Sequence, residues 1–479
     1  MASELKKKTV KGFFWNGIGV FANKGVGFLF GIILARLLTP SDYGLTAMIT
    51  IFMSMAATFV DSGFKSALVR KTDLTEEDNA TAFYFNIVVS LLCYFILYIV
   101  SPFIASFYNR PILCPVLRVQ SLSVIINAFT IVQNTRFTRA LDFKSQSKVL
   151  VLSNILSCIV GVIFAFYGYG VWALVAMNVS HSFFTACLLW YISPWRPKRC
   201  FSTESFHYLF GYGSKLLASG LLNEIFGSIN PIVIGKLFSA SSLGFYTKAG
   251  TMARLPSTNL TYIIQRVTFP VMSKMQNDLE RLRTNYRKLI RVSAYVIFPI
   301  SIGLASVSSP LVTLLYGEKW HPCVPYLQII CFAIMWYPIH ALNLNLLQVQ
   351  GRSDLFLRLE IIKKILTVVV VVCAVPFGVI GICVGSVFSS MIALVINTYY
   401  TGKLIDVGYL LQMKDVLVSL INSLIMGAIA YLFTKLSSIH ILSVIYGLLA
   451  GSVYYFLSSY LLKFEELKYL LEIIKMRNQ

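Results

Sequence analysis

The chain has 479 residues, of which 57% are hydrophobic and only 13% are charged, about half the charged share of a soluble globular domain. A chain of this composition cannot cover itself with polar surface, which excludes a soluble globular protein. The net charge of +21 would suggest nucleic-acid binding in a soluble protein, but here Lys and Arg gather on alternate connections between apolar segments. This distribution follows the positive-inside rule of membrane proteins, so we expect no nucleic-acid partner.

Apolar segments long enough for the ~20 residues that cross a bilayer core recur along the whole chain. The pattern predicts an all-α polytopic membrane protein of about 14 transmembrane helices with the N-terminus inside. The predicted helices cover residues 12–38, 41–63, 80–107, 112–137, 148–167, 170–192, 214–238, 242–272, 289–307, 322–350, 361–375, 378–402, 416–433 and 439–462.

The first predicted helix has a face of small and polar residues that step by three or four positions. These are Gly12, Asn16, Gly19, Asn23 and Gly27. Such a face suits close helix contact or a hydrated cavity. Further along, residues 72–78 have the pattern of an N-cap and predict the start of the third helix there.

Residues 31–45 return, with the same pattern, at 231–245. The identical pairs are Ile32 and Ile232, Leu37 and Leu237, Ser41 and Ser241, and Gly44 and Gly244. A repeat of this length indicates a duplicated bundle, which is typical of transporters. Because each copy would hold six helices, an even number, we expect a pseudo-two-fold axis along the membrane normal.

The strongest break in the apolar pattern is residues 193–199, where two prolines and three cations occur together. It divides the chain into a predicted N-lobe (1–193, helices 1–6), a cytoplasmic linker (194–206), a C-lobe (207–402, helices 7–12), an added helix pair (403–462) and a cytoplasmic amphipathic tail (463–479). The added pair has no counterpart in the repeat.

No arrangement of residues predicts catalysis or a metal site. The five His lie on separate segments, and the nine Cys lie mostly in apolar stretches without C-x-x-C spacing. There is no Ser-His-Asp pattern, no paired carboxylates and no phosphate-binding glycine loop. We therefore expect no enzyme activity, no metal and no cofactor.

Charged residues inside the spans are the candidates for function, because each costs about 2.5 to 3.5 kcal/mol on insertion scales. The candidate substrate-binding cations are Lys24, Lys215, Lys248, Arg254 and Arg266, and the candidate polar cavity residues are Asn16, Asn23, Asn223 and Asn259. Glu224 and Asp61 are candidates for coupling to a proton or sodium gradient.

Several of these residues have structural alternatives. Lys248 could extend its amine to a membrane boundary, and Asp61 could pair with a cation of a neighbouring loop. Lys24 and Glu224 occupy nearly equivalent repeat positions with opposite charges, so they could form a salt bridge instead of binding substrate and ion separately.

The chain also resembles a known family in several stretches. These are LARLLTPSDYG (34–44), DSGF (61–64), VIGKLF (233–238), LGFYTKA (243–249) and FPVMSKMQND (269–278). They resemble the polysaccharide transporter family of the multidrug/oligosaccharidyl-lipid/polysaccharide exporter superfamily, in particular Wzx-like exporters of the colanic and teichuronic acid type.

The resemblance implies a flippase that moves undecaprenyl-diphosphate-linked oligosaccharide across the bacterial cytoplasmic (inner) membrane for surface polysaccharide biosynthesis. It also implies alternating access, a cationic central cavity lined by helices 1, 2, 7 and 8, and cytoplasmic N- and C-termini. The expected partners are the lipid-linked oligosaccharide, membrane lipids, and polysaccharide polymerase and chain-length machinery.

Two other functions stay open from the sequence. A drug or metabolite exporter of the same superfamily would need a more acidic and aromatic cavity than the cationic one expected here. A membrane glycosyl polymerase or ligase would need a large outer loop with catalytic residues, whereas the predicted outer loops are short.

Overall fold

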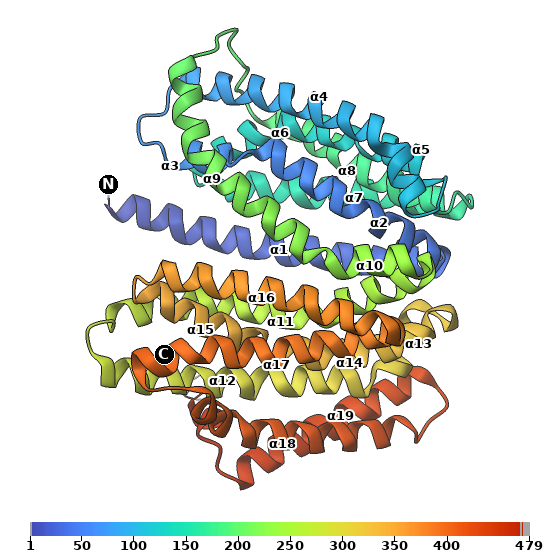
Figure 1. The fold of residues 1–479 in the computed structure, drawn as a ribbon, viewed down its shortest axis with the longest axis vertical. Helices are drawn as coiled ribbons and strands as arrows, with labels where there is room; N and C mark the ends of the chain where they lie inside the picture. Colours follow the sequence, from blue (N-terminus) through green and yellow to red (C-terminus); the bar gives the residue numbers. More distant parts are fainter. Residues whose placement is uncertain (1, 470–471, 473–479) are drawn as a thin grey trace. The chain divides into compact units, whose positions relative to one another are not determined.

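The computed structural model describes residues 2–469 and residue 472, and its regular structure is helical throughout, which confirms the predicted fold class (Figure 1). The first ten helices are α1 (Ala2–Leu37), α2 (Pro40–Asp61), α3 (Phe64–Arg70), α4 (Glu76–Phe107), α5 (Leu113–Gln120), α6 (Leu122–Arg139), α7 (Phe143–Phe166), α8 (Val171–Ile192), α9 (Thr203–Gly227) and α10 (Ile229–Leu237). The chain continues with α11 (Ala240–Lys274), α12 (Leu279–Ser306), α13 (Ser308–Tyr316), η1 (Glu318–Cys323), α14 (Val324–Ile334), α15 (Tyr337–Val349), α16 (Ser353–Ala374), η2 (Val375–Phe377), α17 (Gly378–Ile405), α18 (Tyr409–Thr434) and α19 (His440–Leu461).

Among the described residues, 11 helical stretches are long and apolar enough to cross a membrane, or 12 if α9 and α10, which meet at an angle of 42°, form one span. One stretch, Asp354–Ile405, contains both α16 and α17. These two helices pack against each other: a Cβ added at Gly385 of α17 would lie 3.2 Å from the Cβ of Ala374 at the end of α16. Every predicted transmembrane segment lies on helices. This includes the segment on α11, although α11 is too polar to be one of the 11 apolar stretches.

The chain divides into two compact units, Met1–Gly244 and Phe245–Gln479. Within the first unit, α7 packs against α1 and α8, and α9 packs against α2, α3 and α4. Within the second unit, α12 packs against α18, and α18 lies beside α19, so the added helix pair rests on α12 (Figure 1). Although α9 lies in the predicted C-lobe, it packs in the first unit, and the predicted lobe boundaries stay a prediction.

The repeat identified in the sequence corresponds to a shared turn. At the start of α2, the Thr39 hydroxyl accepts from the Asp42 backbone N–H at 3.3 Å, and the Asp42 carboxylate accepts from the Thr39 N–H at 2.8 Å. This is a capping box. At the start of α11, the Ser239 hydroxyl accepts from the Ser242 N–H at 3.0 Å, so the second copy caps its helix from the same position.

The glycines of the repeat bring the two copies of this turn into contact within the first unit. A Cβ added at Gly44 would overlap the carbonyl oxygen of Ala240, and one at Gly244 would overlap the carbonyl oxygen of Pro40. The contact is reciprocal, since each copy presents its glycine to the first helical residue of the other. Glycine is needed at both positions because no side chain fits between the backbones.

Candidate functional site

A partly open cavity of about 560 Å³ lies within the first unit along α2, α3, α5, α6 and α8, and we call it the α2–α6 slot; some of its lining residues, such as Thr50 and Asn127, are exposed. Its lining residues are Thr46, Ile49, Thr50, Met53, Ser54, Ala57, Val60, Asp61, Lys65, Gln120, Ser123, Val124, Asn127, Thr130, Ile131, Asn134, Asn178, His181 and Ser182. Most of these side chains are polar, which is unusual inside a bundle of membrane helices.

The slot is long and narrow. Its lining residues on α2 recur at steps of three or four from Thr46 to Asp61, and those on α5 and α6 recur in the same way from Gln120 to Asn134. Both sets therefore form continuous helix faces. At 1.5 Å per residue, the face on α2 extends for about 22 Å. A bilayer core is ~30 Å thick, so the slot follows most of a membrane crossing.

The hydroxyl groups along the slot donate their protons to their own helices. Thr50 donates to the Thr46 carbonyl at 2.9 Å, and Thr130 donates to the Asn127 carbonyl at 2.7 Å. Thr46, Ser123 and Ser182 bond in the same way. Their oxygen atoms keep free lone pairs, so these groups offer acceptors to an occupant of the slot.

Amide side chains supply the slot with donors as well as acceptors. They are Gln120, Asn127, Asn134 and Asn178. The Gln120 side chain is only 7% exposed, and its Oε1 atom is buried with no hydrogen-bond partner in the part of the chain that the structure describes. This oxygen has almost no accessible surface, so it does not face the open volume of the slot.

Of the predicted site residues with a described side chain, Asp61 is the one that lines the slot. Its carboxylate accepts from the backbone N–H of Lys65 at 3.4 Å, and Lys65 lines the slot beside it. The two opposite charges lie at the same end of the slot. This bond is to a backbone group of the next helix, whereas the sequence had suggested a loop cation as the structural partner.

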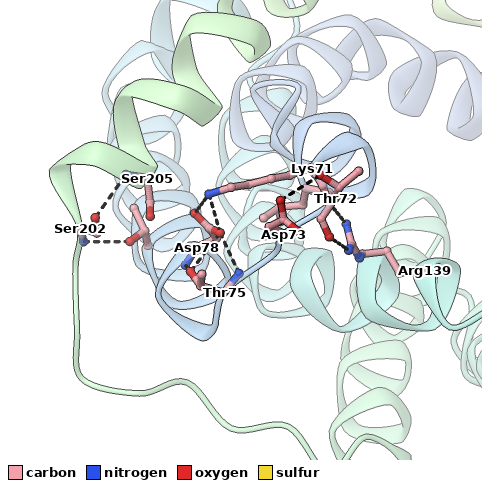
Figure 2. Close-up of polar contacts among 10 residues, drawn as sticks. Lys71, Thr72, Asp73, Thr75, Asp78, Arg139, Ser202 and Ser205 are labelled. Carbon is pink, nitrogen blue, oxygen red and sulfur yellow. Dashed lines mark hydrogen bonds and ion pairs between the residues drawn. The ribbon is translucent and has the colours of Figure 1, made fainter.

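A polar cluster fixes the chain beyond this end of the slot (Figure 2). The Lys71 amine bonds both carboxylate oxygens of Asp78 at 2.8 Å, and Asp78 also completes a capping box with Thr75, which confirms the predicted N-cap. Arg139 of α6 donates to the carbonyls of Leu68 at 2.6 Å and Thr72 at 3.2 Å. The cluster therefore ties α3 and the start of α4 to α6.

Residues 193–199, the predicted break between the two halves, pack against the start of α4 and the end of α6. The Trp195 indole N–H donates to the Glu76 carboxylate at 2.5 Å, and Arg136 donates to the other oxygen of that carboxylate at 2.9 Å. The Trp195 ring is 6% exposed and meets Phe83 edge to face at 5.8 Å. The connection is thus anchored on the first unit by packing and charge.

The structure places the candidate cations in different surroundings. Lys24 on α1, Lys215 on α9 and Arg254 on α11 are exposed. The Lys248 amine is half-buried over aromatic rings, 4.3 Å from the Tyr316 centroid and 5.7 Å from the Trp320 centroid. The side chain of Arg266 lies outside the described residues.

The candidate polar residues also differ from one another. Asn23 accepts from the Asn154 amide at 2.7 Å, which joins α1 to α7. Asn259 donates to the Leu255 carbonyl of its own helix at 2.7 Å, and Asn223 is exposed. Glu224 is half-buried in the last turn of α9. The side chain of Asn16 lies outside the described residues.

The small face of α1 makes a close helix contact. A Cβ added at Gly19 would overlap the Ser147 side chain of α7, and the Ser147 hydroxyl donates to the Trp15 carbonyl at 3.0 Å. Together with the Asn23 to Asn154 bond, these contacts pack α1 directly against α7. Roles for the candidate residues in substrate or ion binding stay predictions.

The comparisons with known proteins start from two family models. The model of the polysaccharide biosynthesis protein family matches residues 33–325. The chain belongs to this family. The model of the lipid II flippase MurJ also matches, over residues 209–450. Both matches confirm the resemblance found in the sequence.

Individual relatives agree with the family. The chain is 28% identical to the teichuronic acid biosynthesis protein TuaB of Bacillus subtilis over 353 residues, which cover 73% of each chain. It is 24% identical to the lipopolysaccharide biosynthesis protein WzxC of Escherichia coli over 402 residues, 83% of this chain and 82% of that one. The predicted tie to surface polysaccharide biosynthesis is therefore confirmed at the level of the family.

Solved structures share the fold. The lipid II flippase MurJ in its inward closed conformation matches with a TM-score of 0.75 at 16% identity, over 94% of this chain and 98% of that one. An inward-facing multidrug resistance MATE family transporter of the MOP superfamily matches with a TM-score of 0.62 at 16% identity, over 80% and 94%. These likenesses show that the chain has the fold of this group of transporters.

Proposed function

We propose that this protein is a flippase that moves undecaprenyl-diphosphate-linked oligosaccharide from the cytoplasmic to the outer leaflet, for the biosynthesis of a surface polysaccharide. The observation that carries the proposal is the combination of a polysaccharide biosynthesis family match with the fold of a lipid II flippase. Alternating access needs two bodies that can move, and the division of the chain into two compact units is compatible with this. The protein is a transporter in this proposal and has no catalytic step.

The charge of the substrate explains the intramembrane cations. A lipid diphosphate carries about two negative charges, and its transfer into a low-dielectric cavity without counter-charges would cost several kcal/mol. The cations that would meet it are Lys24, Lys215 and Arg254, whose side chains are exposed. An inside-negative membrane potential would favour outward movement of the anion by about 2.3 kcal/mol per charge per 100 mV.

The proposal also covers the location of the protein, its partners and the energy source of transport. The protein would be a multi-pass protein of the bacterial cytoplasmic (inner) membrane with both termini in the cytoplasm, and it would pass its substrate to polymerase and chain-length machinery. Transport would couple to a proton or sodium gradient through Glu224 or Asp61. An exporter of drugs or metabolites is not favoured, because the similar sequences are polysaccharide biosynthesis proteins.

The proposal is tested by Lys24→Ala and Arg254→Ala in cells that lack their own flippase. Both variants should lower export of several different glycans carried on the same lipid by at least tenfold, because each removes a counter-charge of the shared diphosphate. Lys435→Ala is the control, since this exposed lysine lies over Tyr431 in the short connection after α18. Export is measured as surface polysaccharide, with lipid-linked glycan accumulating in the membrane.

A different outcome would reassign the cations. If the two variants reached the membrane at normal levels and changed only which glycan is exported, the residues would recognise sugar instead of diphosphate. If the unaltered protein failed to restore export of any lipid-linked glycan, the flippase proposal itself would be wrong.

A further inference from the structure

We propose that the α2–α6 slot binds the sugar chain of the lipid-linked substrate, separately from the cations that meet its diphosphate. The inference rests on the proposed function and assigns a part of the substrate to a cavity that the family match leaves unassigned. Four properties of the slot support it: its charge, its hydrogen-bonding groups, its apolar side chains and its shape.

The charge of the slot is unsuited to an anion. Its lining holds one carboxylate, Asp61, and one amine, Lys65, at the same end, so their formal charges cancel. The remaining described lining holds no Asp, Glu, Lys or Arg, and its one other titratable side chain is the imidazole of His181. A diphosphate needs two or more desolvated cations, which this cavity does not offer. The occupant should therefore be neutral over most of its length.

The hydrogen-bonding groups suit a polyhydroxylated occupant. A sugar hydroxyl both donates and accepts, and the slot offers amides that do both alongside hydroxyl oxygens whose own protons are used within their helices. Ser123, Thr130 and Ser182 are buried along the slot, so an apolar drug or a lipid tail would leave their oxygen lone pairs without partners, which disfavours such occupants.

The apolar part of the lining suits the same ligand. Ile49, Met53, Val60, Val124 and Ile131 alternate with the polar residues along α2 and α6. A sugar ring presents C–H groups on its faces and hydroxyls around its edge, so a wall of mixed character matches it. Such a surface can pack against the C–H faces of a sugar ring while its polar groups form hydrogen bonds with the ring's hydroxyls.

The shape of the slot points to a chain of sugars. A volume of about 560 Å³ lies within the range of small-molecule sites, roughly 300 to 1,000 Å³, and is far larger than a dehydrated cation needs. A length of about 22 Å along α2 allows several sugar units to lie end to end. Polar groups occur along the whole length, as an extended oligosaccharide requires.

The test uses the purified full-length protein in lipid nanodiscs and two probes. One is undecaprenyl diphosphate that carries a neutral trisaccharide, and the other is undecaprenyl diphosphate without sugar. The unaltered protein should bind the first at least tenfold more tightly. Asn127→Leu and Asn178→Leu, which keep side-chain size, should remove this preference and leave the affinity for the sugar-free lipid within twofold.

Two threonines of α6 serve as a matched pair that distinguishes loss of binding from misfolding. Thr130 lines the slot and Thr135 does not, yet both donate their hydroxyl proton to their own helix and both are under 10% exposed. Thr130→Val should weaken binding of the sugar-bearing lipid severalfold, whereas Thr135→Val should not. Thermal unfolding of each variant shows that the fold is retained.

The outcomes separate the two proposals. If the unaltered protein bound neither lipid, the flippase function would fail. If it bound both lipids equally, or if the slot variants kept the preference for the sugar-bearing lipid, the function would stand and the sugar-binding slot would be wrong. Variants that weakened both lipids alike, or that altered only the pH dependence of transport, would also overturn the sugar-binding assignment.

Discussion

The two candidate coupling acids, Glu224 and Asp61, lie in different surroundings. Glu224 is half-buried one turn before the break between α9 and α10, and its backbone carbonyl accepts from the Ser228 N–H at 3.1 Å. Asp61 instead lies at one end of the slot. An acid beside a helix break is well placed for coupling, because a change in its charge can alter the angle between the two segments.

We expect Glu224→Gln to abolish the stimulation of transport by a proton or sodium gradient, because the amide keeps the size of the side chain and loses its ionisation. The measurement is uptake of lipid-linked glycan in proteoliposomes across a range of pH and sodium. Glu204→Gln, an exposed acid in the first turn of the same helix, is the control and should behave as the unaltered protein. Unchanged coupling in Glu224→Gln would exclude this residue.

At the residue scale, the sequence indicated charges inside the spans and four asparagines on the helices expected to line the central cavity. Asp61 was predicted because an acid inside a span is rare, whereas Gln120, Asn127 and Asn134 lie on a segment outside those helices and were not predicted. Their signal was present, since polar residues at 120, 123, 127, 130 and 134 share one helix face. What the sequence alone could not show is that this face looks toward α2, because packing between helices decides it.

At the scale of helices, the reciprocal glycine contact carries the strongest expectation. Gly44→Ala and Gly244→Ala should each destabilise the state in which α2 and the start of α11 touch, by about 1 to 3 kcal/mol, because the added methyl group meets backbone that cannot yield. Both variants should therefore lose most transport while still inserting into the membrane. The measurements are glycan export and the yield of a cross-link between cysteines placed at Ser41 and Ser241.

Gly250→Ala is the matched control, because this glycine also lies on α11 and a Cβ added there would meet nothing within 4 Å. It should export normally and, as an alanine within a helix, even stabilise α11 slightly. If Gly44→Ala behaved like Gly250→Ala, the contact between the two turns would not belong to the transport cycle.

The helices themselves were largely predictable. Apolar length and the N-cap pattern of residues 72–78 predicted segments that all lie on helices. The break between α9 and α10 was missed, although its signal lies in the sequence as Gly227 and Pro231. Pro231 has no N–H to donate to the carbonyl of Gly227, four residues earlier, and its ring clashes with that carbonyl, so a continuous helix is interrupted there.

At the scale of the whole molecule, the basic residues predict which connections between helices lie on the cytoplasmic side of the membrane. A reporter fused after Lys198 should read as cytoplasmic, because the connection carries Arg196, Lys198 and Arg199 and is anchored through Trp195. A fusion at Asn109 should read as external. An external reading at Lys198 would remove the fourteen-helix topology and the predicted cytoplasmic termini with it.

The packing of α9 in the first unit has a consequence for biosynthesis. Phe206 of α9 lies 5.3 Å from the Phe85 ring and 6.4 Å from the Phe64 ring, so α9 covers aromatic residues of α4 and α3. A ribosome that has translated the chain through Arg199 needs roughly 2 to 9 s, at ~5 to 20 residues per second, to reach Gly244. During that interval we expect the Phe64 and Phe85 rings to lie uncovered, and the synthesis of α9 supplies the helix that covers them.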